Sequence, residues 1–224
     1  SQESGIRAGT VARVQRREGL HRLAALEPAP PPRRYGREAP GDLLHLDIKK
    51  LGRFDKPGHR ATDDRQKGRS PGAGWDYVHV TIDDKSRVAC ASIKPEEAGA
   101  SAWRALIPEV RYYRHLGIRS RQVPTDNGAC YRSKAFARVC RRLGLKRKRT
   151  QPYRPRTNDK AERLIQTSLH EWAYARAYDN ADQRAEQLLV RLHQYNWHRP
   201  HSTLGYRPPV SRLPLLSNLM ALHS

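Results

Sequence analysis

Three acidic residues stand at positions where carboxylates could do chemistry. Asp47 lies in a segment of alternating apolar and polar residues, Asp126 follows a short β-prone segment, and Glu162 lies in a helical pattern. Carboxylate oxygens suit Mg²⁺, and a pair of such ions can activate a nucleophile, stabilise a phosphate under attack and neutralise a leaving oxygen. Taken singly, each residue also fits an ordinary solvated position, and the sequence of residues 125–128 is a common turn.

The elements that would position these carboxylates follow an α/β order. Leu44, Leu46 and Ile48 alternate with polar residues, which predicts a strand in which Asp47 faces away from these apolar side chains. The later patterns predict, in chain order, a β-hairpin over 75–93, a helix near 102–110, a strand at 122–123, a helix over 133–143, a strand over 145–150 and helices near 158–172 and 188–192. The fold class expected is α/β, with a mixed sheet flanked by helices.

Composition divides the chain into four parts. Residues 1–26 contain a short helical pattern with Thr10 as its N-cap. The pattern resembles the second half of a helix-turn-helix, whose first helix would lie before Ser1, but a solvated basic linker helix fits equally well. Residues 27–40 are expected to be a Pro-rich linker, 41–178 the main α/β domain, and 179–224 a C-terminal helical extension and tail.

The chain is strongly basic. Its 43 Lys and Arg outnumber 22 Asp and Glu, for a net charge of +21, which predicts a polyanionic partner. Nucleic acid is favoured over membrane, because no apolar run of about 18 residues and no signal segment is present; we expect a soluble intracellular protein. The three cysteines show no CxxC spacing and are expected to be reduced thiols. Other nucleic-acid-binding proteins share this charge, so it does not by itself indicate catalysis.

Taken together, the three acidic segments resemble DDE transposases and retroviral integrases. Between Asp126 and Glu162 lie 35 residues, the spacing that names the family's D,D(35)E signature. The resemblance spans residues 40–212 and is closest to bacterial insertion-sequence transposases of the IS3 and IS481 kind. The further family-like stretches are 123–128, 152–158, 162–167, Tyr195-Asn196, Arg199-Pro200-His201 and Leu204-Gly205.

Three features depart from the family pattern. Asp159 stands where many relatives have Gly, and Pro124 stands where they usually carry an apolar residue other than proline. The carboxylate of Asp159 also fits the first turn of a helix, which favours negative charge. The polar insertion at 53–74 is longer than in typical relatives, and we expect a long exposed excursion whose role is open.

The resemblance implies an RNase H-like fold and a DNA transposase. Asp47, Asp126 and Glu162 would be the catalytic residues and the ligands of two Mg²⁺ or Mn²⁺ ions, with Asp47 bridging both. Water would first expose a 3′-OH at an element end, and that hydroxyl would attack target DNA without ATP and without a covalent protein intermediate. The implied partners are double-stranded DNA and further copies of the chain, in the bacterial cytoplasm at the nucleoid. The alternatives are an inactive DNA-binding remnant and an RNase H-like nuclease that cuts without joining.

A basic strip between Arg138 and Arg163 is the expected DNA-binding region. It contains eleven Lys and Arg and two acidic residues, and its cations would neutralise phosphates. A generic solvated face or a localisation signal is the alternative. The DNA-binding candidates are Lys146, Arg147, Lys148, Arg149, Arg154, Arg156, Lys160 and Arg163.

The histidines give no strong metal signal. His193, His198 and His201 lie close in sequence but lack cysteine partners at zinc-finger spacing, so structural zinc is not expected. His45 lies two residues from Asp47 on the same strand face, where it could orient that carboxylate or pack at the sheet edge.

Overall fold

The computed structural model describes Gly5 and residues 7–20, 36–57, 70–125, 128–149 and 159–213. The chain separates into two compact units, Ser1–Tyr35 and Gly36–Ser224. The first unit contains α1 (Ala8–Arg17), and no residue of this helix is buried. The prediction of Thr10 as N-cap is wrong, because the helix begins earlier and has Arg7 as its N-cap. Val14 of this helix is 45% exposed.

The second unit, called the main unit below, has five strands among its described residues. β1 (Leu44–Gly52), β2 (Trp75–Asp83) and β3 (Ala89–Lys94) form an antiparallel sheet in that order. β4 (Gln122–Thr125) and β5 (Lys146–Arg149) pair in parallel, and β4 lies against β1. The expected hairpin, the two later strands and the mixed α/β architecture are thus confirmed.

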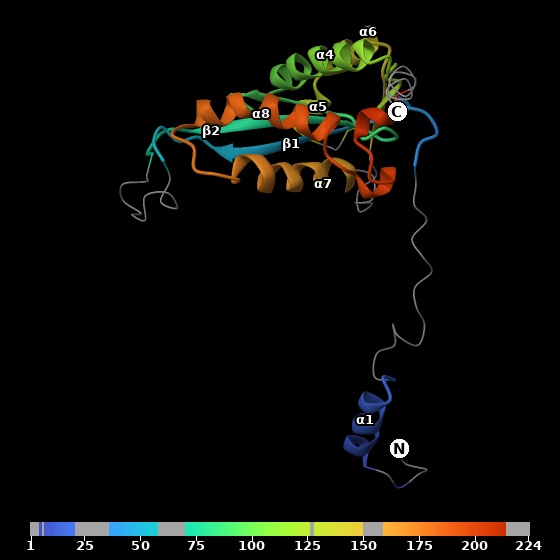
Figure 1. Cartoon of the computed structure of the whole chain (residues 1–224). Helices are drawn as coiled ribbons and strands as arrows, with labels where there is room; N and C mark the ends of the chain where they lie inside the picture. The colour runs from blue at the N-terminus through green and yellow to red at the C-terminus, as the bar shows by residue number, and fades with distance from the viewer. Residues whose placement is uncertain are drawn as a thin grey trace. The chain divides into compact units, whose positions relative to one another are not determined.

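Helices cover both faces of the three-stranded sheet (Figure 1). α4 (Gly99–His115), α5 (Ala129–Arg132) and α6 (Lys134–Arg142) lie on one face. α7 (Asp159–Ser168), the π-helical turn η2 (Leu169–Ala173) and α8 (Ala181–Trp197) lie on the other. Two 3-10 turns, η3 (Ser202–Leu204) and η4 (Pro209–Arg212), follow α8.

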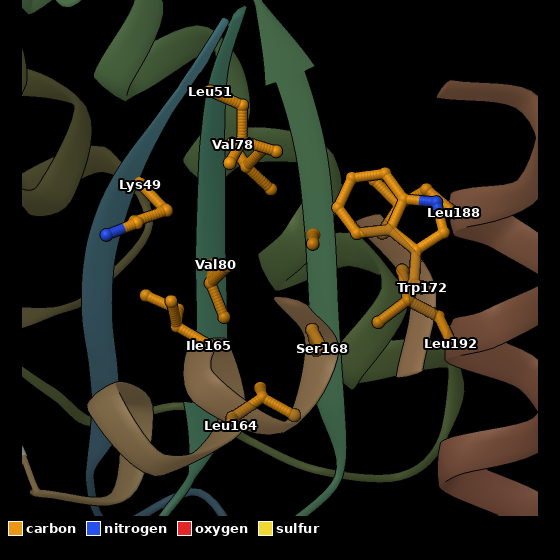
Figure 2. A pocket seen from close by; sticks show the side chains of 11 residues that line it. Lys49, Leu51, Val78, Val80, Leu164, Ile165, Ser168, Trp172, Leu188 and Leu192 are labelled. Atoms are coloured by element: carbon orange, nitrogen blue, oxygen red, sulfur yellow. The ribbon is translucent and has the colours of Figure 1, made fainter. Parts of the chain in front are cut away.

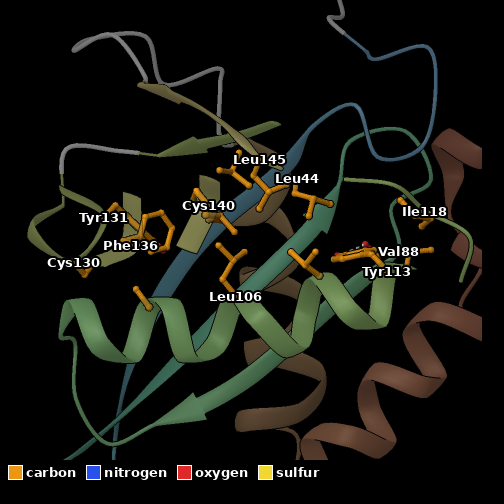
Figure 3. Close-up of a cluster of buried hydrophobic side chains, with 14 of the residues drawn as sticks. Leu44, Val88, Leu106, Tyr113, Ile118, Cys130, Tyr131, Phe136, Cys140 and Leu145 are labelled. Carbon is orange, nitrogen blue, oxygen red and sulfur yellow. Dashed lines mark hydrogen bonds between the residues drawn. The ribbon is translucent and has the colours of Figure 1, made fainter. Parts of the chain in front are cut away.

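The strand register assigns side chains to the two faces. Leu44 pairs with Asp83 and Leu46 with Thr81, and both leucines belong to the core beneath α4 and α6. In Figure 3, Leu106 of α4 and Phe136 of α6 belong to the same buried cluster as Leu44. Side chains alternate along a strand, so the intervening residues of β1 face the other helical layer.

The second core lies between the sheet and the α7–α8 layer. Val78 and Val80 of β2 are buried there with Leu164 of α7, Trp172 of η2 and Leu188 of α8. Figure 2 shows these side chains around a mainly apolar pocket. The indole of Trp172 donates a hydrogen bond of 2.8 Å to the carbonyl of Arg184, which ties η2 to α8.

Ser133 confirms one local prediction from the sequence. It is the N-cap of α6, and its hydroxyl accepts a hydrogen bond of 3.1 Å from the N–H of Phe136. This satisfies one of the backbone donors that a helix leaves free in its first turn. The helix ends before Gly144, whose φ of 73° suits a residue without a side chain.

Candidate functional site

Asp47 lies in the middle of β1, on the face of the sheet that α7 covers. Its cross-strand partner is Val80, which is buried against α7 and α8. The prediction that Asp47 faces away from Leu44 and Leu46 is therefore confirmed. Asp47 is half-buried, and its Oδ1 accepts a hydrogen bond of 2.8 Å from the N–H of Ile48.

Glu162 lies on the exposed side of α7. Ala161, Leu164 and Ile165 of the same helix are buried in the second core, whereas Glu162 is exposed. The buried apolar residues of α7 therefore hold the helix against the sheet, and Glu162 lies on the side of the helix that is exposed. Because α7 lies against β1, Asp47 and Glu162 belong to two elements in direct contact.

Asp126 lies outside the described residues, directly after β4. Thr125 is the last residue of β4, and β4 lies against β1. The topology thus brings the strand that leads into Asp126 beside the strand that carries Asp47. Among the described residues, which exclude Asp126, no group of three His, Cys, Asp or Glu could hold a metal ion. The convergence of all three carboxylates stays a prediction.

A buried hydrogen-bonded cluster centred on Asp84 anchors the start of α7. Asp84, in the turn after β2, is 2% exposed. Its Oδ1 lies 2.7 Å from Nε2 of His45 and also accepts from Nζ of Lys160, whose ammonium is 3.2 Å from the Asp84 carbonyl oxygen. The N–H of Arg37 donates to Oδ2 at 2.8 Å. Lys160 precedes Glu162 by two residues, so this cluster fixes the turn of α7 that carries the candidate ligand.

The Asp84 carboxylate is charged in this setting. Burial opposes its ionisation, but the hydrogen bonds from His45, Lys160 and Arg37 outweigh burial and hold the pKa of Asp84 below its ordinary value. Burial also lowers the pKa of Lys160, which Asp84 partly offsets. His45 thus binds Asp84, not Asp47. The hairpin predicted over 75–93 needs a turn where Asp84 lies, but nothing in the sequence pattern pointed to Lys160 as the partner of Asp84.

The predicted DNA-binding residues fall into three groups. Lys146, Arg147 and Lys148 are exposed on β5, and Arg147 also donates to the carbonyl of Tyr131 at 3.2 Å. Arg163 is exposed on α7, whereas the ammonium of Lys160 is engaged with Asp84. The side chain of Arg149 is not described, and Arg154 and Arg156 lie outside the described residues.

His193, His198 and His201 do not form one cluster. The Nε2 atoms of His193 and His198 lie 3.3 Å apart at the end of α8. Nδ1 of His201 instead lies 3.0 Å from the hydroxyl of Thr203. Burial, and to a smaller extent the charge of nearby arginines, lowers the pKa of His201.

In the part of the chain that the structure describes, no helix is long and apolar enough to cross a bilayer.

Comparisons with known protein families give one consistent result. Two sequence profiles, both described as "Integrase core domain", match residues 37–155 and 143–209. The first covers more than half of the chain and includes Asp47 and Asp126; the second includes Glu162.

Curated relatives are bacterial transposases. The chain is 37% identical over 86 residues to the putative transposase InsD for insertion element IS2E of Escherichia coli (strain K12), an alignment that covers 38% of this chain and 39% of that protein. It is equally similar to transposase InsD for insertion element IS2A/D/F/H/I/K of Escherichia coli, of which 28% is covered. The chain thus spans well under half the length of the curated relatives it matches.

Solved structures with a similar fold are retroviral integrases. A chain of the simian T-cell lymphotropic virus intasome in complex with PP2A regulatory subunit B56 gamma matches with a TM-score of 0.60 and 20% identity, over 95% of this chain and 69% of that one. The catalytic core domain of BIV integrase matches with a TM-score of 0.53 and 16% identity, over 82% and 99%. These likenesses confirm the RNase H-like fold expected from the sequence.

Proposed function

The chain belongs to the integrase core domain family, and we propose that it is the catalytic part of a DNA transposase that cuts and joins DNA strands in a divalent-metal-dependent reaction. One observation carries the proposal. The register of β1 against β2 puts Asp47 on the face covered by α7, the helix of Glu162, and β4, which ends at Thr125 directly before Asp126, lies against β1. These contacts support the convergence of the residues that have the D,D(35)E spacing.

The donor set fits hard divalent cations. Asp47, Asp126 and Glu162 offer carboxylate oxygens, the ligands that Mg²⁺ and Mn²⁺ prefer. Such ions, when bound, would polarise the phosphate and lower the pKa of an attacking water or hydroxyl. We propose that Asp47 contributes to both ion positions and that Asp126 and Glu162 each complete one.

The protein itself supplies position and charge. Asp47 is held on a strand, and its Oδ1 is oriented by the N–H of Ile48. Glu162 is held by α7, whose first turn is tied to Asp84 through Lys160. Sites built on strands and helices hold their groups more accurately than sites on loops. Exposed cations on β5 and Arg163 on α7 would contact phosphates on either side of the scissile bond.

Duplex DNA and further copies of the chain are the proposed partners. Element ends and a target must be held together for strand joining, which favours an oligomer on DNA, and we propose that this takes place in the bacterial cytoplasm. The InsD relatives are named as transposases of insertion elements, and one structural neighbour is an intasome. Both support this assignment over an unrelated nuclease.

The proposal is tested with a duplex oligonucleotide that carries the terminal sequence flanking the gene. We expect cleavage and joining in Mg²⁺ that fall at least about 100-fold in Asp47→Asn, Asp126→Asn and Glu162→Gln, because each change removes a ligand charge while nearly keeping size. Denaturing gels that resolve cut and joined products measure both steps.

The matched control is Glu186→Gln, which removes an exposed carboxylate of α8 and should leave both steps within about two-fold. Undiminished strand transfer by Asp47→Asn in Mg²⁺ would defeat the metal-site proposal. Cut product without joined product would instead favour the hydrolytic nuclease, and DNA binding without either product would favour the inactive remnant.

A further inference from the structure

The positive charge of the main unit is concentrated in one stretch of sequence. Residues 98–149 contain 14 Lys and Arg but only two acidic residues, Glu109 and Asp126. Residues 159–213, of similar length, contain eight Lys and Arg and six acidic residues. The first stretch forms the α4–α6 layer and the β4–β5 pair, whereas the second forms the α7–α8 layer. The charge surplus therefore belongs to the α4–α6 layer and the β4–β5 pair.

The outer face of α4 is basic. The helix buries Leu106 and Tyr113 against the core (Figure 3), together with Val110. Its exposed positions are Arg104, Pro108, Arg111, Arg114 and His115. The arginines thus lie on the side of α4 that points away from the sheet.

The outer face of α6 continues the same pattern. Phe136 and Cys140 are buried, and the exposed positions of the helix are Lys134, Ala135, Arg138, Arg141 and Arg142. α6 packs directly against α4, and Arg114 donates to the carbonyl of Leu143 just past the end of α6. The exposed cations of the two helices therefore form one surface, which we call the α4–α6 surface; its members are Arg104, Arg111, Arg114, Lys134, Arg138, Arg141 and Arg142.

The charges of the α4–α6 surface are not neutralised locally. None of its cations has a carboxylate partner among the described residues. Glu109, the one acidic residue of α4, cannot compensate, because it is 2% exposed and burial raises its carboxyl pKa well above the ordinary value. Several unpaired cations on two packed helices repel one another, and a polyanion would relieve that repulsion.

We propose that the α4–α6 surface binds the phosphate backbone of duplex DNA, as a second DNA-binding surface on the face of the sheet opposite α7. The proposal rests on the proposed transposase function for its choice of DNA. From Arg104 to Arg114 the helix rises about 15 Å, a length over which a duplex carries about nine phosphates. A surface of this size can hold one duplex while Asp47 and Glu162 face another.

Other occupants fit the surface less well. A second copy of this chain through the same surface would bring like charges together. A membrane or a single-stranded nucleic acid would call for exposed apolar or aromatic side chains. Within the described ranges, the exposed large hydrophobic residues all lie on other elements: Val14, Leu20, Trp75, Tyr174, Leu189, Val190 and Tyr206.

The test compares two quadruple variants of equal net charge. The first neutralises the surface with Arg104→Gln, Arg111→Gln, Arg138→Gln and Arg141→Gln. The second neutralises four exposed cations elsewhere, with Lys56→Gln, Arg176→Gln, Arg207→Gln and Arg212→Gln. Binding of a fluorescent 20-base-pair duplex of arbitrary sequence is followed by anisotropy from about 50 to 300 mM salt, and circular dichroism checks that both variants fold.

We expect the surface variant to bind at least about ten-fold more weakly at 100 mM salt. The slope of the logarithm of the binding constant against the logarithm of the salt concentration should become shallower by about 3 to 4, because each lost phosphate contact removes about 0.9 from this slope. The control variant should stay within about three-fold of the natural chain. Equal losses in the two variants would overturn the inference, because they would show only the general field of a basic protein. Tighter binding of a 20-base single-stranded RNA, lost with the same four substitutions, would overturn the choice of duplex DNA.

This outcome is independent of the cleavage assay. If the natural chain cuts and joins DNA while the two quadruple variants bind alike, the surface assignment fails and the proposed function stands. If the surface variant loses duplex binding while the natural chain shows no cleavage in Mg²⁺, the transposase proposal fails and the DNA-binding surface stands.

Discussion

Lys160 illustrates how one residue can carry two competing roles. Its place two residues before Glu162, within a basic strip, predicts a phosphate contact. In the structure its side chain is 19% exposed and ion-paired with the buried Asp84. Because this ammonium is mostly buried and paired with Asp84, it can fix the orientation of α7, but little of it is available to contact a phosphate. The DNA contact stays a prediction, and the geometry favours a positioning role.

We therefore predict that Lys160→Met lowers the rate of strand transfer about ten-fold or more while DNA affinity changes less than about two-fold. The substitution keeps the aliphatic stem but removes the only partner of Asp84 that α7 supplies among the described residues, so that the first turn of α7 is less well fixed. Strand-transfer rates and duplex anisotropy are measured on the same preparation.

Arg163→Met is the comparison for Lys160→Met, since Arg163 is exposed on the same helix. It should weaken duplex binding and reduce the salt slope by about 1. If Lys160→Met behaves in the same way, Lys160 is a phosphate contact and the positioning role is wrong.

At the scale of elements, one buried side-chain amide joins α8 to β3, while Arg184 of the same helix donates to the carbonyl of Gly52 in β1 and to Asp76 in β2. The amide of Asn196 accepts from the N–H of Ala89 and donates to the carbonyl of Ala89, both at 2.8 Å, and Asn196 is 1% exposed. It thus pairs with both backbone groups at the start of β3. Leu188 and Tyr195 of α8 belong to the same core as Leu164 of α7. The helix expected as part of a C-terminal extension therefore packs as part of the main unit.

Asn196→Ala should lower the free energy of unfolding by about 3 kcal/mol, because it leaves a buried N–H and a buried carbonyl of Ala89 without partners. Urea unfolding of the whole chain measures the change. Glu186→Ala, at an exposed position of the same helix, should change stability by less than about 0.5 kcal/mol. A loss under about 1 kcal/mol for Asn196→Ala would show that apolar packing and the contacts of Arg184 hold α8 without this amide.

At the scale of the whole molecule, two buried titratable groups, His79 of β2 and Glu109 of α4, make the free energy of unfolding depend on pH. Burial, with a smaller effect of Lys94, lowers the pKa of His79 to about 4. Burial raises the pKa of Glu109 well above its ordinary value, although Ser92 donates to its carboxyl group at 3.3 Å. His79 is neutral in the folded protein near pH 7, and it binds protons more readily once unfolded.

The sign of the His79 effect follows from proton binding. Between about pH 6.5 and 4 the unfolded chain binds more protons at this residue, so the free energy of unfolding falls on acidification by up to about 3 kcal/mol. His79→Phe should remove this acid-side loss, as measured by urea unfolding at pH 7 and pH 4.5. His170→Phe, at an exposed position, should keep it. The raised pKa of Glu109 acts in the opposite direction, because it lowers stability as the pH rises above 4.5. This contribution is present in the natural chain and in both variants, so it does not affect the comparison.

The sequence by itself determined the local elements and the chemistry. The strand over Leu44–Ile48, the Ser133 cap of α6 and the apolar stripe of α7 were predicted from short segments, and the structure has each of them. The candidate carboxylates were identified in the same way, from residue type and from the spacing between Asp126 and Glu162. Periodicity records which side chains an element buries, so it can be read without knowing the fold.

Only the tertiary structure decided what each element faces. Two examples are the pairing of Lys160 with Asp84 and of Asn196 with Ala89, which join residues far apart in the chain. The difference in charge between the two helical layers likewise depends on how distant segments pack. No local pattern specifies such partners, because hydrogen bonds and ion pairs are decided by which surfaces the packed sheet brings together. The side of the sheet on which Asp47 lies was predictable relative to its own strand, but its placement beneath α7 depended on the register and on the packing of that helix.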